Sequence, residues 1–165
     1  MSKPSDHPLN APAETPLPRY LGEMVGPTVS ESFGWHSHEF GQLISAASGS
    51  MYVGTPGRVL LLSPAMILWI PPNVQHWMRY DTGNEMRYVD VRADEAENIG
   101  RDCRIMPSTP LLNALMTATQ PGDANGRAED HDATLHQLLR HELMAAPDIP
   151  LSISIPQDHR IRRFA

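Results

Sequence analysis

The stretch Gly34-Trp35-His36-Ser37-His38-Glu39-Phe40-Gly41-Gln42 is the most informative part of this sequence, because it places two histidines two residues apart. In a β-strand, residues i and i+2 point to the same face, so both imidazoles could share one ion. A third histidine, His76, follows the turn Pro71-Pro72-Asn73 and opens a later candidate strand. Imidazoles suit divalent zinc, nickel or iron, and a side-chain amide oxygen could add a ligand. The predicted metal ligands are His36, His38, Gln42 and His76; the alternative is surface histidines, or core histidines held by hydrogen bonds.

Short candidate strands surround this pattern. Turn signals such as Gly54–Gly57 separate them at the spacing of about eight to twelve residues that is typical of a sandwich or small barrel. The candidate strands cover residues 28–35, 42–47, 51–53, 58–62, 66–70, 75–80 and 85–92. No helical pattern lies between them, which argues against a doubly wound fold. The sequence therefore predicts a mostly β domain over residues 28–106.

Residues 107–147 change to a helical period and predict two α-helices. Ser108 or Thr109 can cap the first helix with Pro110 at its first position, and the second runs from about residue 128 to 146. Their apolar stripes are Leu111, Leu112, Leu115 and Met116, and Leu135, Leu138, Leu139 and Leu143. Such stripes either pack on the barrel or form a dimer surface. If the helices stand off the barrel, a dimer would bury Leu111, Leu115, Leu135 and Leu139.

The two ends differ from the middle of the chain. Residues 1–27 hold six of the sixteen prolines and are expected to form an extended arm, with Tyr20–Val25 docking on the body. Residues 148–165 read as a linker followed by the start of a helix too short to be stable alone. We therefore expect the chain to continue into a further domain.

Charge and composition exclude several function classes. The 165 residues carry 13 basic and 19 acidic side chains, a net charge of −6, and the acidic excess lies mainly in residues 94–148. A chain without a broad basic face should not bind nucleic acid strongly by itself. No apolar run approaches the ~20 residues of a membrane span, and no signal peptide follows Met1. With one cysteine, Cys103, these features favour a cytoplasmic protein without a membrane partner.

Both histidine segments are similar to known motifs. Gly34–Gln42 resembles the first cupin motif and Pro72–His76 the second, although Gln42 and Asn73 replace the usual glutamate and glycine. The stretch from His36 to about Phe164 resembles the N-terminal cupin of AraC-type transcription regulators. The matching segments are His36–Leu43, Leu68–His76, Cys103–Ile105, Ser108–Leu112 and Leu151–Arg160.

The resemblance implies a fold and a function. The fold would be a cupin, a double-stranded β-helix forming a small jelly-roll-like barrel, followed by two α-helices. The chain would be a non-enzymatic domain that senses a small-molecule effector and forms a homodimer. DNA would be bound only through a C-terminal helix-turn-helix domain beyond this chain. The alternatives are a metal-dependent cupin enzyme, such as a dioxygenase or isomerase, and a stand-alone small-molecule-binding cupin.

Strand phase identifies the candidate effector pocket inside the barrel. Its residues alternate in phase with the histidines, and the alternative for each is ordinary barrel core. The candidate pocket residues are Ile44, Met51, Val53, Met78 and Tyr80. Trp35, Trp69 and Trp77 are expected to pack as apolar anchors rather than to contact the ligand.

Overall fold

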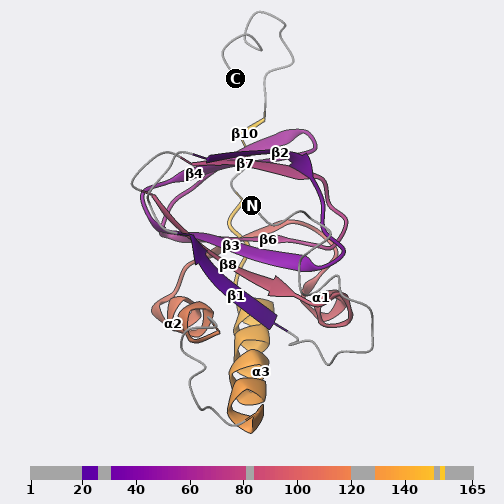
Figure 1. Ribbon diagram of the computed structural model, residues 1–165, viewed down its shortest axis with the longest axis vertical. Coiled ribbons are helices and arrows are strands. Elements are labelled where there is room, and N and C mark those ends of the chain that lie inside the picture. The colour runs from indigo at the N-terminus through magenta and orange to yellow at the C-terminus, as the bar shows by residue number, and fades with distance from the viewer. Residues whose placement is uncertain (1–19, 26–30, 81–83, 120–128, 151–152, 155–165) are drawn as a thin grey trace, which may run out of the picture.

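The computed structural model describes residues 20–25, 31–80, 84–119, 129–150 and 153–154, and in them two stacked β-sheets with helices outside one sheet (Figure 1). Sheet A has the strand order β1-β8-β3-β6-β9 and sheet B the order β10-β5-β4-β7-β2. The strands are β1 (Tyr20–Val25), β2 (Glu31–His36), β3 (Gly41–Ser48), β4 (Met51–Thr55), β5 (Arg58–Leu62), β6 (Met66–Ile70), β7 (His76–Tyr80), β8 (Glu85–Val91), β9 (Arg104–Pro107) and β10 (Ile153–Ser154). The helices are α1 (Ala93–Ile99), α2 (Pro110–Ala118) and α3 (Glu129–Ala145). The mostly β architecture expected from the sequence is confirmed, and every strand pair is antiparallel in the described residues.

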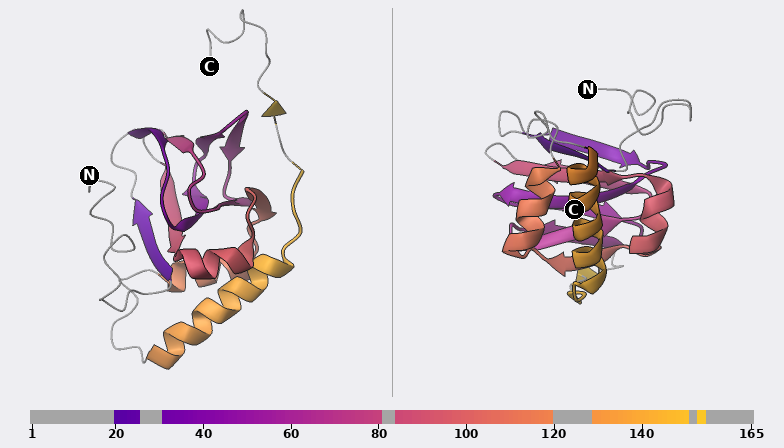
Figure 2. Two further views of the ribbon diagram at one scale, coloured as in Figure 1. Left: turned by 90° about the vertical axis from the view of Figure 1, so that its right-hand side faces the viewer. Right: turned by 90° about the horizontal axis from the view of Figure 1, so that it is seen from below.

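Alternation along the strands of sheet A separates two apolar cores. On β3, Ile44 points between the sheets and joins the inner core, whereas Leu43 points to the helices and joins the outer core. On β6, Leu68 likewise joins the inner core and Trp69 the outer core. Figure 2 shows the helices gathered on one side of the sheets. Sheet A is therefore covered on both faces, which explains the nearly continuous burial along β3 and β6.

A third helix, α1, lies in the segment assigned to the barrel, so the expected count of two helices was wrong. Asp94 and Glu95 occupy its first turn, where the helix dipole favours acidic side chains. Ala96 and Ile99 are one turn apart and join the outer core. Seven residues are too few to show a repeating apolar pattern, so tertiary packing rather than periodicity specifies this helix.

The predicted start of α2 is confirmed. Thr109 caps the helix by accepting a hydrogen bond from the backbone N–H of Leu112 at 3.2 Å, and Pro110 is its first residue.

The helices pack directly on sheet A, which corrects the expectation for their leucines. Leu115 and Leu139 are 4% and 0% exposed in the outer core, and Leu135 packs against it. Leu111 and Leu138 remain 44% and 41% exposed. Most of the leucine set proposed to bury against a second subunit is thus already buried within one chain.

The ends of the chain add edge strands. β1 pairs with β8 along its whole length, so the expected docking of residues 20–25 takes the form of a strand. β10 pairs with β5 at the edge of sheet B. The rest of the predicted arm, residues 1–19, and the predicted helix start after Pro156 lie outside the described residues. No helix in the described part of the chain is long and apolar enough to cross a membrane.

Candidate functional site

Two antiparallel strands and a tight turn position the three histidines. His36 ends β2 and pairs with His76, the first residue of β7, after a register shift between Phe33 and His36. His38 lies in the loop after β2, and its carbonyl oxygen accepts a 2.7 Å hydrogen bond from the backbone N–H of Asn73. Asn73 has φ +62°, a left-handed conformation that asparagine adopts more readily than most residues. The Asn73 turn therefore joins the loop of His38 to the segment that carries His76.

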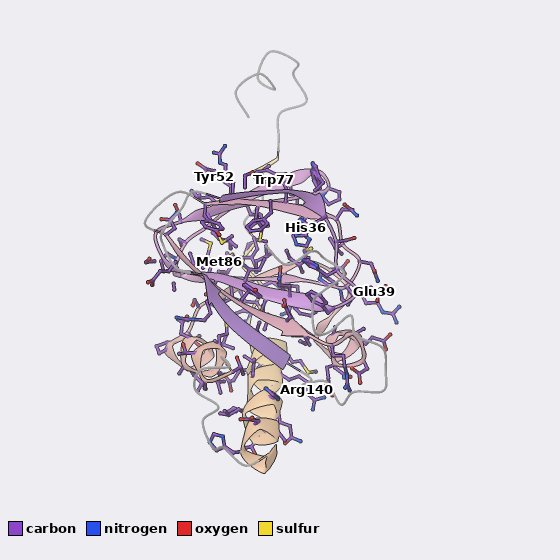
Figure 3. All side chains as sticks on the ribbon, in the orientation of Figure 1. His36, Glu39, Tyr52, Trp77, Met86 and Arg140 are labelled. Carbon is purple, nitrogen blue, oxygen red and sulfur yellow. The ribbon has the colours of Figure 1, made fainter. Side chains whose placement is uncertain are left out.

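The three imidazoles converge. One ligand nitrogen from each of His36, His38 and His76 lies within 4.8 Å of the other two. The ring centroids are 4.2 Å apart for His36 and His76 and 4.9 Å apart for His36 and His38. Figure 3 shows His36 between the two sheets, at one side of the barrel. Tetrahedral zinc needs about 3.3 Å between neighbouring nitrogen ligands, so small rotations of the rings suffice to bring them to that spacing.

Backbone hydrogen bonds fix the tautomers of two of these rings. The Nδ1 atoms of His36 and His76 lie 2.7 Å from the carbonyl oxygen of Gly34 and 2.9 Å from that of Val74. A carbonyl oxygen only accepts, so each Nδ1 carries a hydrogen, and Nε2 is the nitrogen that either ring can offer to a ligand. The Nε2 atom of His76 is buried without a hydrogen-bond partner in the described part of the chain. An imidazole anchored at Nδ1 with an open Nε2 is the usual form of a metal ligand.

Burial keeps His76 neutral. Desolvation lowers the pKa of His76 from 6.5 to about 4, the hydrogen bond to Val74 opposes this change, and the nearby His36 adds to it. At neutral pH the ring is therefore unprotonated, as metal binding requires.

Gln42, the second residue of β3, has a buried partner that was not predicted from the sequence. Its Nε2 donates a 2.9 Å hydrogen bond to Oδ1 of Asp90, which is 1% exposed. Its Oε1 is buried without a hydrogen-bond partner among the described residues, so it keeps a lone pair for a ligand. Asp90 lies four residues after Met86 on β8, so both side chains point to the same face, and Met86 belongs to the inner core. This alternation could have predicted from the sequence that Asp90 faces the inside of the barrel.

The five predicted pocket residues come together inside the barrel. Ile44, Met51, Val53, Met78 and Tyr80 are each 5% exposed or less and belong to the inner core. The tryptophans differ in burial: Trp69 is fully buried in the outer core, whereas Trp35 is 58% exposed. Trp35 was expected to pack, and it fails to because it precedes the inward-facing His36 on β2 and so falls on the outer face of sheet B.

The arrangement fits a divalent metal ion. It offers three convergent imidazoles, of which His76 has a buried nitrogen without a hydrogen-bond partner in the described part of the chain. Such a set would hold zinc, nickel or iron and leave coordination positions open. Glu39, the nearest carboxylate in the sequence, is exposed at the outer edge of the molecule, apart from His36 (Figure 3).

Comparison with known families identifies the domain. A family model described as the AraC-like ligand binding domain matches residues 28–152. The chain belongs to this family. No curated protein matches the chain.

The solved structures of ToxT agree with the fold. ToxT from Vibrio cholerae O395 has a TM-score of 0.55 at 6% identity, and the match covers 77% of this AraC-like domain and 55% of ToxT. ToxT from strain SCE256 with bound unsaturated fatty acid has a TM-score of 0.50 at 7% identity, covering 75% and 52%. An RmlC-like cupin from Shewanella frigidimarina has a TM-score of 0.41 at 19% identity, covering 46% and 68%. The chain thus spans about half the length of ToxT, and the two ToxT matches, at 6% and 7% identity, support the fold alone.

Proposed function

We propose that this AraC-like domain is the effector-sensing and dimerising part of a cytoplasmic transcription regulator that binds DNA through a C-terminal helix-turn-helix domain. The observation that carries the proposal is the match to the AraC-like ligand binding domain over residues 28–152. The acidic charge of the chain agrees with a domain that does not bind DNA itself. The regulatory output would follow from an effector that binds two arrangements of the domain with different affinity.

The inner core is the proposed effector site. Met51 and Met78 are flexible side chains that can rearrange around a small apolar group. Gln42 and Asp90 place a hydrogen-bonded polar pair on the same inner face of sheet A as Ile44. An effector with an apolar body and one or two polar groups would match this combination.

The histidines are the proposed metal site. Zinc, nickel or iron would be held by His36, His38 and His76, with Gln42 as a further oxygen ligand. A bound ion supplies a Lewis acid with open positions at which a donor atom of the effector can bind. Hydrogen bonds would orient these ligands. The carbonyl oxygens of Gly34 and Val74 hold the rings of His36 and His76, and Asp90 holds the amide of Gln42.

Metal binding is tested by dialysis against zinc, nickel or ferrous ions followed by elemental analysis. We expect about one ion per chain. His76→Ala and His38→Ala should lose the ion, whereas His131→Ala, at an exposed histidine on α3, should keep it. Equal metal content in all three variants would refute the site.

The regulatory role is tested with the product of the full gene. We expect that product to retard DNA from its own upstream region in a gel, and the 165-residue chain to leave it unretarded. Tight sequence-specific binding by the 165 residues, or a full product without DNA binding, would contradict the proposal.

A metal-dependent enzyme is the second candidate, favoured by the three-histidine cluster with open positions. Asp90 would be its buried carboxylate, although Oδ1 already accepts from Gln42. Turnover of a small oxygen-consuming or isomerised substrate by the metal-loaded chain would favour the enzyme over the sensor.

A further inference from the structure

A cavity lies outside the barrel, between sheet A and α2. It has a volume of about 250 Å³, which suits a ligand smaller than a drug-sized molecule. Its lining combines small apolar residues with three polar ones: Ala46, Ala47, Pro64, Arg87, Asn113, Ala114 and Thr117. Figure 1 shows α2, which contributes part of this lining, on the left below the sheets.

Arg87 is the one charged residue of this lining. It lies on β8 two residues before Val89, an outer-core residue, and therefore faces the helices. Nη1 of Arg87 donates to Oδ1 of Asn113 at 3.3 Å, a long hydrogen bond to a neutral group. None of the ion pairs found among the described side chains involves Arg87.

Unsatisfied polar atoms gather at this place. The Nε atom of Arg87 is buried without a hydrogen-bond partner in the described structure. Ser45 pairs with Arg87 across β3 and β8, is 0% exposed, and its Oγ atom also has no partner there. A buried polar group without a partner costs free energy, so such groups commonly mark a missing ligand.

We propose that this cavity binds a small monocarboxylate with a short apolar body. A guanidinium matches the two oxygens of a carboxylate, and Nε is a donor that Arg87 does not otherwise use. The alanines and Pro64 offer an apolar surface for the rest of the ligand. Asn113 and Thr117 come from α2, so the ligand contacts the sheet and the helix together.

This site is separate from the histidine cluster. Arg87 and Val89 face the helices, whereas Gln42 and Ile44 face the inside of the barrel, so sheet A stands between the two sites. The proposal therefore does not depend on a metal or on the inner effector pocket.

The test measures binding of sodium butyrate and sodium benzoate by calorimetry at neutral pH, with butyramide and benzamide as uncharged matches. We expect at least one carboxylate to bind saturably, and its amide to bind about tenfold more weakly or not at all. Arg87→Met should reduce the affinity about tenfold or more, because the charge is lost at similar length. Arg101→Met, at an exposed arginine outside the lining, should bind like the original chain.

A second variant keeps the test valid if Arg87→Met does not fold. Ala114→Leu lies on the exposed side of α2, where leucine favours the helix, and fills the cavity. It should abolish carboxylate binding while its circular dichroism stays unchanged, and His76→Ala should retain binding. Absence of saturable binding, equal affinity for acid and amide, or unchanged binding by both cavity variants would overturn the proposal.

Discussion

His76 is a buried histidine held neutral by its surroundings. It is 1% exposed, its Nδ1 is bound to the backbone, and its Nε2 has no partner in the described part of the chain. Such a ring lowers the stability of the folded chain unless a ligand binds it. On folding, its buried Nε2 loses its hydrogen bonds to water and gains none from the protein. A ligand bound at Nε2 of His76 would therefore also stabilise the domain.

We predict that the metal-free domain loses stability as pH falls from 6.5 to 4. The pKa of His76 is about 4 in the folded chain and 6.5 for a ring fully exposed to water, so in this window the unfolded chain binds a proton that the folded chain does not. The free energy of unfolding then decreases with falling pH, by up to about 3 kcal/mol over the window. Urea unfolding with EDTA present measures this.

Two variants separate His76 from other groups that titrate. His76→Gln keeps a polar side chain without a titrating ring and should flatten the pH dependence between 6.5 and 4. His131→Gln, at an exposed histidine, should keep the pH dependence of the unsubstituted chain. An unchanged slope in His76→Gln would mean that other groups cause it.

Among the structural elements, those with strong local signals were predictable. Arg58–Leu62 and Met66–Ile70 match β5 and β6 because turn residues bound them on both sides. The short α1 was not predicted, because its two buried apolar residues, Ala96 and Ile99, are too few to show a helical repeat. Its formation depends on contacts with the outer core. Gln42 was predicted as a ligand, but its pairing with Asp90 joins two strands 48 residues apart, and no local pattern reports such a contact.

The turn between β6 and β7 gives a prediction at this scale. We expect Asn73→Gly to fold normally and Asn73→Val to lose about 1–2 kcal/mol, because a β-branched residue resists the φ of +62°. The same substitution should weaken the backbone hydrogen bond from Asn73 N–H to the carbonyl oxygen of His38. Asn73→Val should therefore also bind metal less tightly. Chemical unfolding and metal titration measure the two effects. Equal stability of the valine and glycine variants would show that the left-handed turn is not required.

At the scale of the whole molecule, sheet A separates the two apolar cores. Its inner face belongs to the core that holds the proposed effector site, and its outer face belongs to the core that holds the helices. A change in the inner core can reach the helices only through this sheet, whose tightly packed side chains do not deform freely. The helices also keep exposed leucines, Leu111 on α2 and Leu138 on α3.

The homodimer is the prediction that belongs to this scale. Leu138 is 41% exposed, so Leu138→Glu should leave the fold intact and weaken a helix-mediated dimer about tenfold or more, because a charge would be buried at the interface. Leu61→Glu, at a 48% exposed leucine on sheet B, should remain dimeric. Leu135→Glu is unsuitable, since Leu135 packs against the outer core and its loss would unfold the domain. Light scattering over a concentration series measures the mass, and a monomer at every concentration, or a dimer unaffected by Leu138→Glu, would exclude pairing through these helices.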